Sequence, residues 1–249
     1  MKNIFLAISF FTSIKMPNVE FKQNNYRYLP ILLPFVGLLI GSIGYGVYTV
    51  LNLVEISPFL KAITITIYFA FITGGLHLDG LLDTVDSHYS RRDLERRLEI
   101  MHTSTIGAFA CIYAILFFIL KVAVLNELIL NDYLGYSIIL IPIISRSFAG
   151  ILISSARFAS DNGLANMYKY TVKKWFNYVI AIQLLVVITF GYVTDIDLII
   201  IVVACMLYCL VYLKFMYKNF NGITGDILGA FIETSELVML LAMLGLMLW

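Results

Sequence analysis

Three aspartates at short intervals are the first residues in this chain whose types and spacing suggest chemistry. Asp79, Asp83 and Asp86 stand in the segment Gly74–Asp86, which follows a long apolar run. In a helix, spacings of four and three residues place the three carboxylates on one face, within about 60° of each other. Like charges that close repel, and each loses hydration near a membrane, so we expect a divalent cation such as Mg²⁺ among them. The alternative is a solvated acidic loop.

A second acidic group lies near the carboxyl end. Asp226 and Glu233 are seven residues apart, which is two turns along one helix face, and Glu236 lies one turn further. Glycines around Asp226 allow another helix or a ligand to approach the backbone. Carboxylates buried in a membrane need a proton, a cation or a hydrogen-bond donor, so Glu233 and Glu236 are expected to have one.

Arg146 is the expected counter-charge, because it falls inside an apolar run. A guanidinium suits bidentate contact with a carboxylate or a phosphate. An ion pair with Glu233 or Glu236 and direct binding of phosphate are both open, and we favour phosphate. His77 lies on the helix face opposite Asp79, where packing or hydrogen bonding is a better interpretation than metal ligation.

Composition then sets the class of protein. Of the 249 residues 61% are hydrophobic and 13% charged, which is too apolar for a soluble domain. The apolar residues come in unbroken blocks long enough to cross a hydrocarbon core of about 30 Å, and only helices or closed barrels satisfy the backbone there. We therefore predict an all-α, polytopic membrane bundle of about seven transmembrane helices. The predicted spans are 29–54, 59–78, 105–127, 133–155, 175–194, 197–214 and 227–248.

The distribution of basic residues orients the chain. Fourteen of the 17 lysines and arginines fall on one side of the predicted spans. By the positive-inside rule, the amino terminus and the loops 79–104 and 156–174 are cytoplasmic, and the carboxyl terminus lies outside. Residues 1–16 are expected to form an interfacial amphipathic helix, and so are residues 91–99. Residues 1–249 are expected to form one integral membrane domain in the cell membrane, with no nucleic-acid partner and with homo-oligomerisation left open.

At this point several blocks resemble the cobalamin synthase family, whose members are adenosylcobinamide-GDP ribazoletransferases. They are the segment Gly74–Asp86, the segment Arg97–Met101 followed by Ser104 and Gly107, and the segment Thr224–Ala230 with Glu233 and Glu236. The resemblance implies that a hydroxyl of α-ribazole, or of its 5′-phosphate, attacks the cobinamide-side phosphorus of adenosylcobinamide-GDP. GMP leaves, and Mg²⁺ is implied as the cofactor.

Roles for single residues follow from this reaction. We predict that Asp79, Asp83 and Asp226 hold Mg²⁺ and that Asp86 or Glu99 orients or deprotonates the attacking hydroxyl. The remaining predicted contacts to substrate come from His77, Ser104, Arg146, Thr224, Glu233 and Glu236. Two other functions stay open at this stage: a CDP-alcohol phosphotransferase of lipid synthesis, which also uses clustered aspartates, and a cation-coupled transporter.

Overall fold

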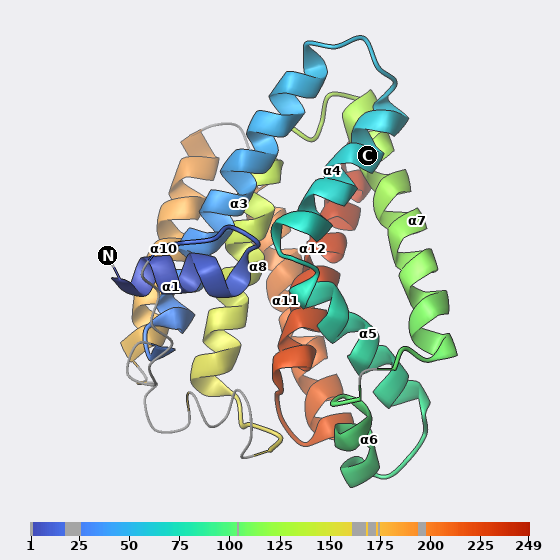
Figure 1. The fold of residues 1–249 in the computed structure, drawn as a ribbon. Helices are drawn as coiled ribbons and strands as arrows, with labels where there is room; N and C mark the ends of the chain where they lie inside the picture. Colours follow the sequence, from blue (N-terminus) through green and yellow to red (C-terminus); the bar gives the residue numbers. More distant parts are fainter. Residues whose placement is uncertain are drawn as a thin grey trace.

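In a computed structural model of the protein, residues 2–17, 26–103, 105–160, 168, 173, 175–193 and 198–249 are described. Over these ranges the chain forms a bundle of helices (Figure 1), and the one strand-like pairing is a single bridge between Phe158 and Ile223. The predicted all-α class is confirmed.

Six helices are long and apolar enough to cross a membrane, and each matches a predicted span. They are α3 (Leu29–Asn52), α7 (Ala108–Leu130), α8 (Ser137–Ser155), α10 (Trp175–Val193), α11 (Leu198–Phe220) and α12 (Gly225–Met247). The prediction of a multi-pass membrane bundle is therefore confirmed.

The second predicted span is bent. Helix α4 (Pro58–Ile72) ends early, and α5 (Leu76–Tyr89) continues at 89° to it. Gly74 and Gly75 have φ angles of 62° and 75°, a left-handed conformation that glycine adopts without steric cost and that no α-helix contains. The predicted span 59–78 is therefore not one continuous helix, because α4 ends at Ile72 and residues 76–78 belong to α5. Counted as one bent span, the pair brings the total to seven.

Two short helices complete the described part of the chain. Helix α1 (Lys2–Phe11) lies across the bundle (Figure 1), and the Ser13 N–H just beyond it donates to the Ile72 carbonyl at the α4–α5 bend (2.8 Å). Helix α6 (Leu94–Ile100) begins at Asp93, whose side chain accepts from the Arg96 N–H (3.0 Å). The region predicted as loop 79–104 thus contains most of α5 and all of α6.

Helices α8 and α12 form the centre of the bundle. Their most apolar stretches are 78% and 72% buried, whereas those of α7, α10 and α11 are 22–28% buried and face outwards. Where α3 crosses α8, Gly37 lies against the Pro142 carbonyl with no room for a side chain. Charged residues on α8 and α12 consequently lie away from lipid.

Candidate functional site

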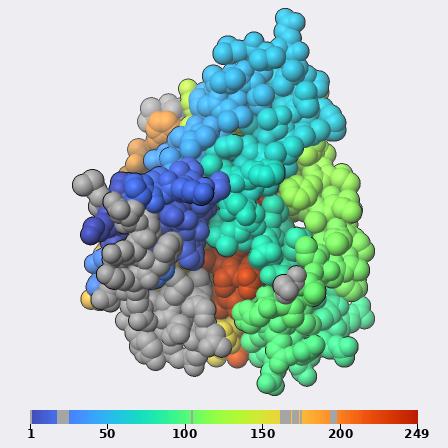
Figure 2. Space-filling view, viewed as in Figure 1, coloured from blue at the N-terminus to red at the C-terminus, as the bar shows by residue number. Residues whose placement is uncertain are grey.

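Helices α5 and α12 cross at two glycines, which brings the two acidic groups together. A methyl group at Gly80 would lie 2.7 Å from the Asp226 carbonyl oxygen, and one at Gly229 would lie 3.2 Å from the His77 backbone. The close crossing therefore depends on both glycines lacking a side chain. In the view of Figure 2, the orange-red surface of residues near the carboxyl end shows in a recess beside the green surface of residues around 80–110.

Four carboxylates lie within electrostatic range of one another at this crossing. The charge of Asp83 is opposed by those of Asp79, Asp226 and Asp86, and Asp226 is opposed by Asp79 and attracted by His102. Asp79 is exposed, while Asp83 and Asp226 are partly buried. Between described residues, no lysine or arginine forms an ion pair with these three aspartates. The crossing is thus a region of concentrated negative charge.

The side chains at the crossing do not form a closed cage. Within the part of the chain that the structure describes, no three His, Cys, Asp or Glu side chains are grouped tightly enough to hold a metal ion by themselves. A cation at this site would need ligands from a substrate or from water as well. That requirement matches the habit of Mg²⁺, which is usually bound by one or two carboxylates together with phosphate oxygens and waters.

Asp86 has a structural contact that the sequence did not suggest. Its carboxylate accepts hydrogen bonds from the backbone N–H groups of Gly107 and Ala110, the latter at 2.8 Å, and so caps the first turn of α7. A side chain at Gly107 would collide with this carboxylate. Asp86 therefore joins α5 to α7, and both of its oxygens are engaged.

Thr224 and Glu99 also have local partners. The Thr224 hydroxyl accepts from the Ile227 N–H (3.2 Å) and so caps the amino-terminal end of α12. Asp226 lies in this capped first turn, so the cap helps to fix its position. Glu99 is exposed on α6 and pairs with Arg96 at 2.6 Å. An open cavity of about 690 Å³, lined by Arg92 and Arg96 among others, lies on the same helix. Ser104 lies outside the described residues.

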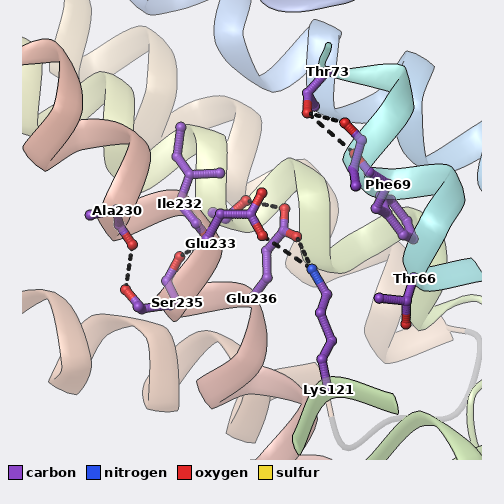
Figure 3. Close-up of polar contacts among 12 residues, drawn as sticks. Thr66, Phe69, Thr73, Lys121, Ala230, Ile232, Glu233, Ser235 and Glu236 are labelled. Atoms are coloured by element: carbon purple, nitrogen blue, oxygen red, sulfur yellow. Dashed lines mark hydrogen bonds and ion pairs between the residues drawn. The ribbon is translucent and has the colours of Figure 1, made fainter. Parts of the chain in front are cut away.

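Two ion pairs are buried in the centre of the bundle. The Arg146 guanidinium on α8 donates to Glu236 on α12 and to the Ser145 hydroxyl. The Lys121 ammonium on α7 lies 3.2 Å from a Glu233 carboxylate oxygen and 3.8 Å from one of Glu236. Figure 3 shows Lys121 reaching across to both carboxylates. Two positive and two negative charges therefore balance in the buried centre of the bundle.

Lys121 is the partner that sequence reasoning missed. It is 4% exposed although it lies in one of the two most apolar helices. A lysine inside a span, facing the same bundle as two unmatched glutamates, was the signal that could have identified it. His77 is also buried, and its Nε2 has no hydrogen-bond partner among the described residues.

The arrangement divides the predicted residues into two sets. Asp79, Asp83 and Asp226 have no lysine or arginine partner among the described residues, and at the α5–α12 crossing they can bind a cation that also contacts an anionic substrate. The ion pairs of Arg146 and Lys121 join α7, α8 and α12 inside the bundle, and no substrate is needed to neutralise them.

Comparison with known proteins gives a consistent result along the chain. A model of the cobalamin-5-phosphate synthase family matches residues 3–244. A protein of Clostridium botulinum strain 657 named adenosylcobinamide-GDP ribazoletransferase is 36% identical over 245 residues, covering 98% of both chains. A protein of the same name from Clostridioides difficile strain 630 is 33% identical over 97% of this chain and 96% of its own length. Another, from Clostridium novyi strain NT, is 33% identical over 98% of this chain and 97% of its own length. No solved structure matches.

Proposed function

The chain belongs to the cobalamin-5-phosphate synthase family, as its motifs predicted, and we propose that it joins adenosylcobinamide-GDP to ribazole or ribazole 5′-phosphate. A ribazole hydroxyl oxygen forms a bond to the cobinamide-side phosphorus, and the bond from that phosphorus to the bridging oxygen breaks. GMP leaves with the bridging oxygen, and the hydroxyl proton passes to a base. This is the last step in assembling the nucleotide loop of the corrinoid.

The observation that carries this proposal is the concentration of carboxylates at the α5–α12 crossing. Asp79, Asp83 and Asp226 repel one another, and no described lysine or arginine neutralises them. Oxygen ligands of this charge fit Mg²⁺, and we assign these three residues to it. When bound, the ion would supply positive charge to the pyrophosphate oxygens.

The residue that accepts the proton is the second part of the proposal. Both oxygens of Asp86 already accept backbone N–H groups of α7, so we assign Asp86 to positioning α7 against α5. Glu99 is exposed, and among the described residues it is hydrogen-bonded through one oxygen, to Arg96, so its other oxygen can accept from a hydroxyl. We therefore prefer Glu99 as the group that orients or deprotonates the nucleophile.

The contacts of Arg146 support a structural role for this residue over the phosphate binding that we first favoured. Its guanidinium faces Glu236 and is 1% exposed, so a phosphate would have to displace a buried carboxylate. We propose that Arg146 and Glu236, with Lys121 and Glu233, hold α12 in place. Because Asp226 lies at the beginning of the same helix, these buried ion pairs also help to position its carboxylate.

The orientation in the membrane remains part of the proposal. The basic bias places the amino terminus and the acidic crossing on the cytoplasmic side of the cell membrane. Thiol labelling of single-cysteine variants in intact cells tests this orientation. Introduced cysteines near Asp132 should react from outside and those near Arg92 should not, and labelling at Arg92 would reverse the assignment.

The activity itself can be tested with the full-length protein purified in detergent. Adenosylcobinamide-GDP, ribazole and Mg²⁺ are supplied, and GMP and the joined corrinoid are measured by chromatography. Formation of both products in equal amounts, with loss of activity on chelation of Mg²⁺, is the expected result. Transfer from a CDP-alcohol instead, or no GMP in any condition, would contradict the proposal.

A further inference from the structure

A cavity lined largely by aromatic rings lies on the side of α5 opposite the acidic crossing. We call it the aromatic cavity; it measures about 340 Å³ and is bounded by α5, α7, α11 and α12. Thr84 and His88 line it from α5, one turn apart on one face. At 100° per residue, that face is turned by about 140° from the face that carries Asp79 and Asp83, so the two sites lie on different sides of α5.

The walls of the aromatic cavity are flat rings whose own polar groups are satisfied. Tyr208 and Tyr212 on α11 lie 5.7 Å apart, and their hydroxyls bond to Thr234 (2.6 Å) and to the Ile227 carbonyl (2.7 Å). Among the described residues that line it there is no aspartate, glutamate, lysine or arginine. Such walls favour an uncharged, planar ligand that stacks on them.

Two residues that line this cavity each carry a polar atom with no hydrogen-bond partner among the described residues. These atoms are the Thr84 hydroxyl and the Nδ1 of His88, both buried. The Thr84 side chain is 4% exposed, and a buried hydroxyl left without a partner costs about 1–3 kcal/mol. Thr66, equally buried at 4%, behaves as helical threonines usually do and donates to the Ala62 carbonyl (2.8 Å). Thr84 differs from Thr66 in lining a space that a ligand can occupy, so that a rotation of its side chain can bring the hydroxyl to a ligand there.

From these observations, and resting on the proposed function, we infer that the aromatic cavity binds the uncharged base of the ribazole substrate. A volume of about 340 Å³ is near the lower end of ligand sites, which admits a base and excludes a corrinoid ring system. Guanine is a poorer fit, because its edge carries more donors and acceptors than Thr84 and His88 can match, and unmatched polar groups disfavour binding.

The position of the aromatic cavity suits a substrate that reacts at the acidic crossing. Tyr89 and Tyr113 line the cavity, and Tyr89 stacks on Phe109 in the first turn of α7, the turn that Asp86 caps. These ring contacts lead from the cavity to Asp86, whose charge lies within range of Asp83. A base held in the cavity would therefore have its sugar at this end, toward Asp86.

The test uses the full-length protein in detergent and two variants that keep side-chain shape. Thr84→Val removes the hydroxyl and His88→Phe removes Nδ1 while keeping a ring. Each should raise the KM for ribazole, and its Kd in direct calorimetric titration, by about threefold to tenfold, the effect of one hydrogen bond. The KM for adenosylcobinamide-GDP should not change. The control, Thr66→Val, removes an equally buried hydroxyl outside the cavity and should leave the ribazole Kd unchanged.

Four outcomes would overturn the inference. The first is a Kd for ribazole that is unchanged from the wild type in both variants. If GMP is still released in that case, the proposed function holds and only the inference is rejected. A larger effect on the KM for adenosylcobinamide-GDP than for ribazole would place the guanine base there instead. A lipid that co-purifies with the wild-type protein, is lost from Thr84→Val and is not displaced by ribazole would show that the cavity serves the bilayer. Absence of both ribazole binding and GMP release in the wild type would reject the proposed function together with the inference.

Discussion

Replacing Lys121 by methionine should destabilise the protein strongly, because it leaves two carboxylates in the bundle with one cation. Glu233 and Glu236 are each 4% exposed, and the Lys121 ammonium is the nearer cation to Glu233, at 3.2 Å. Removing one partner of a buried ion pair costs about 3–5 kcal/mol, most of it the penalty of the charge left behind. For a chain of this length that corresponds to a fall in Tm of about 6–20 °C.

The companion variants separate this explanation from a simple loss of packing. Glu233→Gln alone leaves Lys121 with Glu236 at 3.8 Å and should cost less. The double variant Lys121→Met with Glu233→Gln should recover most of the loss, because the charges are again balanced. Lys61→Met is the control, since Lys61 hydrogen-bonds the neutral Asn52 near the surface and should change Tm little. Tm is followed in one detergent for all variants.

Two results would refute the reasoning. A Tm for Lys121→Met equal to that of Lys61→Met would mean that the buried pair carries no stability. A double variant as unstable as the sum of the two single variants would mean that Lys121 and Glu233 do not interact.

Four further predictions concern single residues of the site. Asp79→Asn should lower turnover by at least about 100-fold and raise the Mg²⁺ concentration needed for half-maximal rate, both read from initial rates of GMP release; an unchanged Mg²⁺ response would remove Asp79 from the metal site. Asp86→Ala should lower the unfolding free energy by about 1–2 kcal/mol, the cost of a lost helix cap, as measured by thermal melting, while some turnover remains; an unaltered Tm would show that the cap is unimportant. Arg146→Lys should fold with a reduced Tm and keep a wild-type KM for adenosylcobinamide-GDP; a large rise in that KM at unchanged Tm would instead indicate phosphate binding. Glu99→Gln should lower turnover by at least about 100-fold with little change in the KM of either substrate, whereas an unchanged turnover would show that Glu99 is not the base.

The spans were predictable because a membrane imposes the same requirement on every segment that crosses it. Each of the six long helices needs some twenty apolar residues, and that pattern is visible without any knowledge of the partners. The proximity of Asp79 and Asp83 to Asp226 could also be predicted from the sequence, because neither acidic group alone has enough carboxylates to complete a cation site.

The bend between α4 and α5 was less accessible. Gly74 and Gly75 stand in a continuous apolar run, and glycine in such a run is as often a site of helix packing as a break. The sequence gives their type but not their φ angles. The partner of Glu233 depends on which face of α7 turns inward, and an almost uniformly apolar helix gives no such indication. The aromatic cavity arises from four helices together, so no local pattern contains it.

The central claim is that carboxylates from α5 and α12 serve one reaction. It is tested most directly by the rate of GMP release from adenosylcobinamide-GDP and ribazole in Asp83→Asn, in Asp226→Asn and in the double variant. If both residues hold the same ion, either substitution already removes its function, and the double variant should lose scarcely more than the worse single variant. If the fold-loss of rate in the double variant equals the product of the two single losses, Asp83 and Asp226 act independently and the claim is contradicted. A wild-type protein that releases no GMP would contradict the proposed reaction itself.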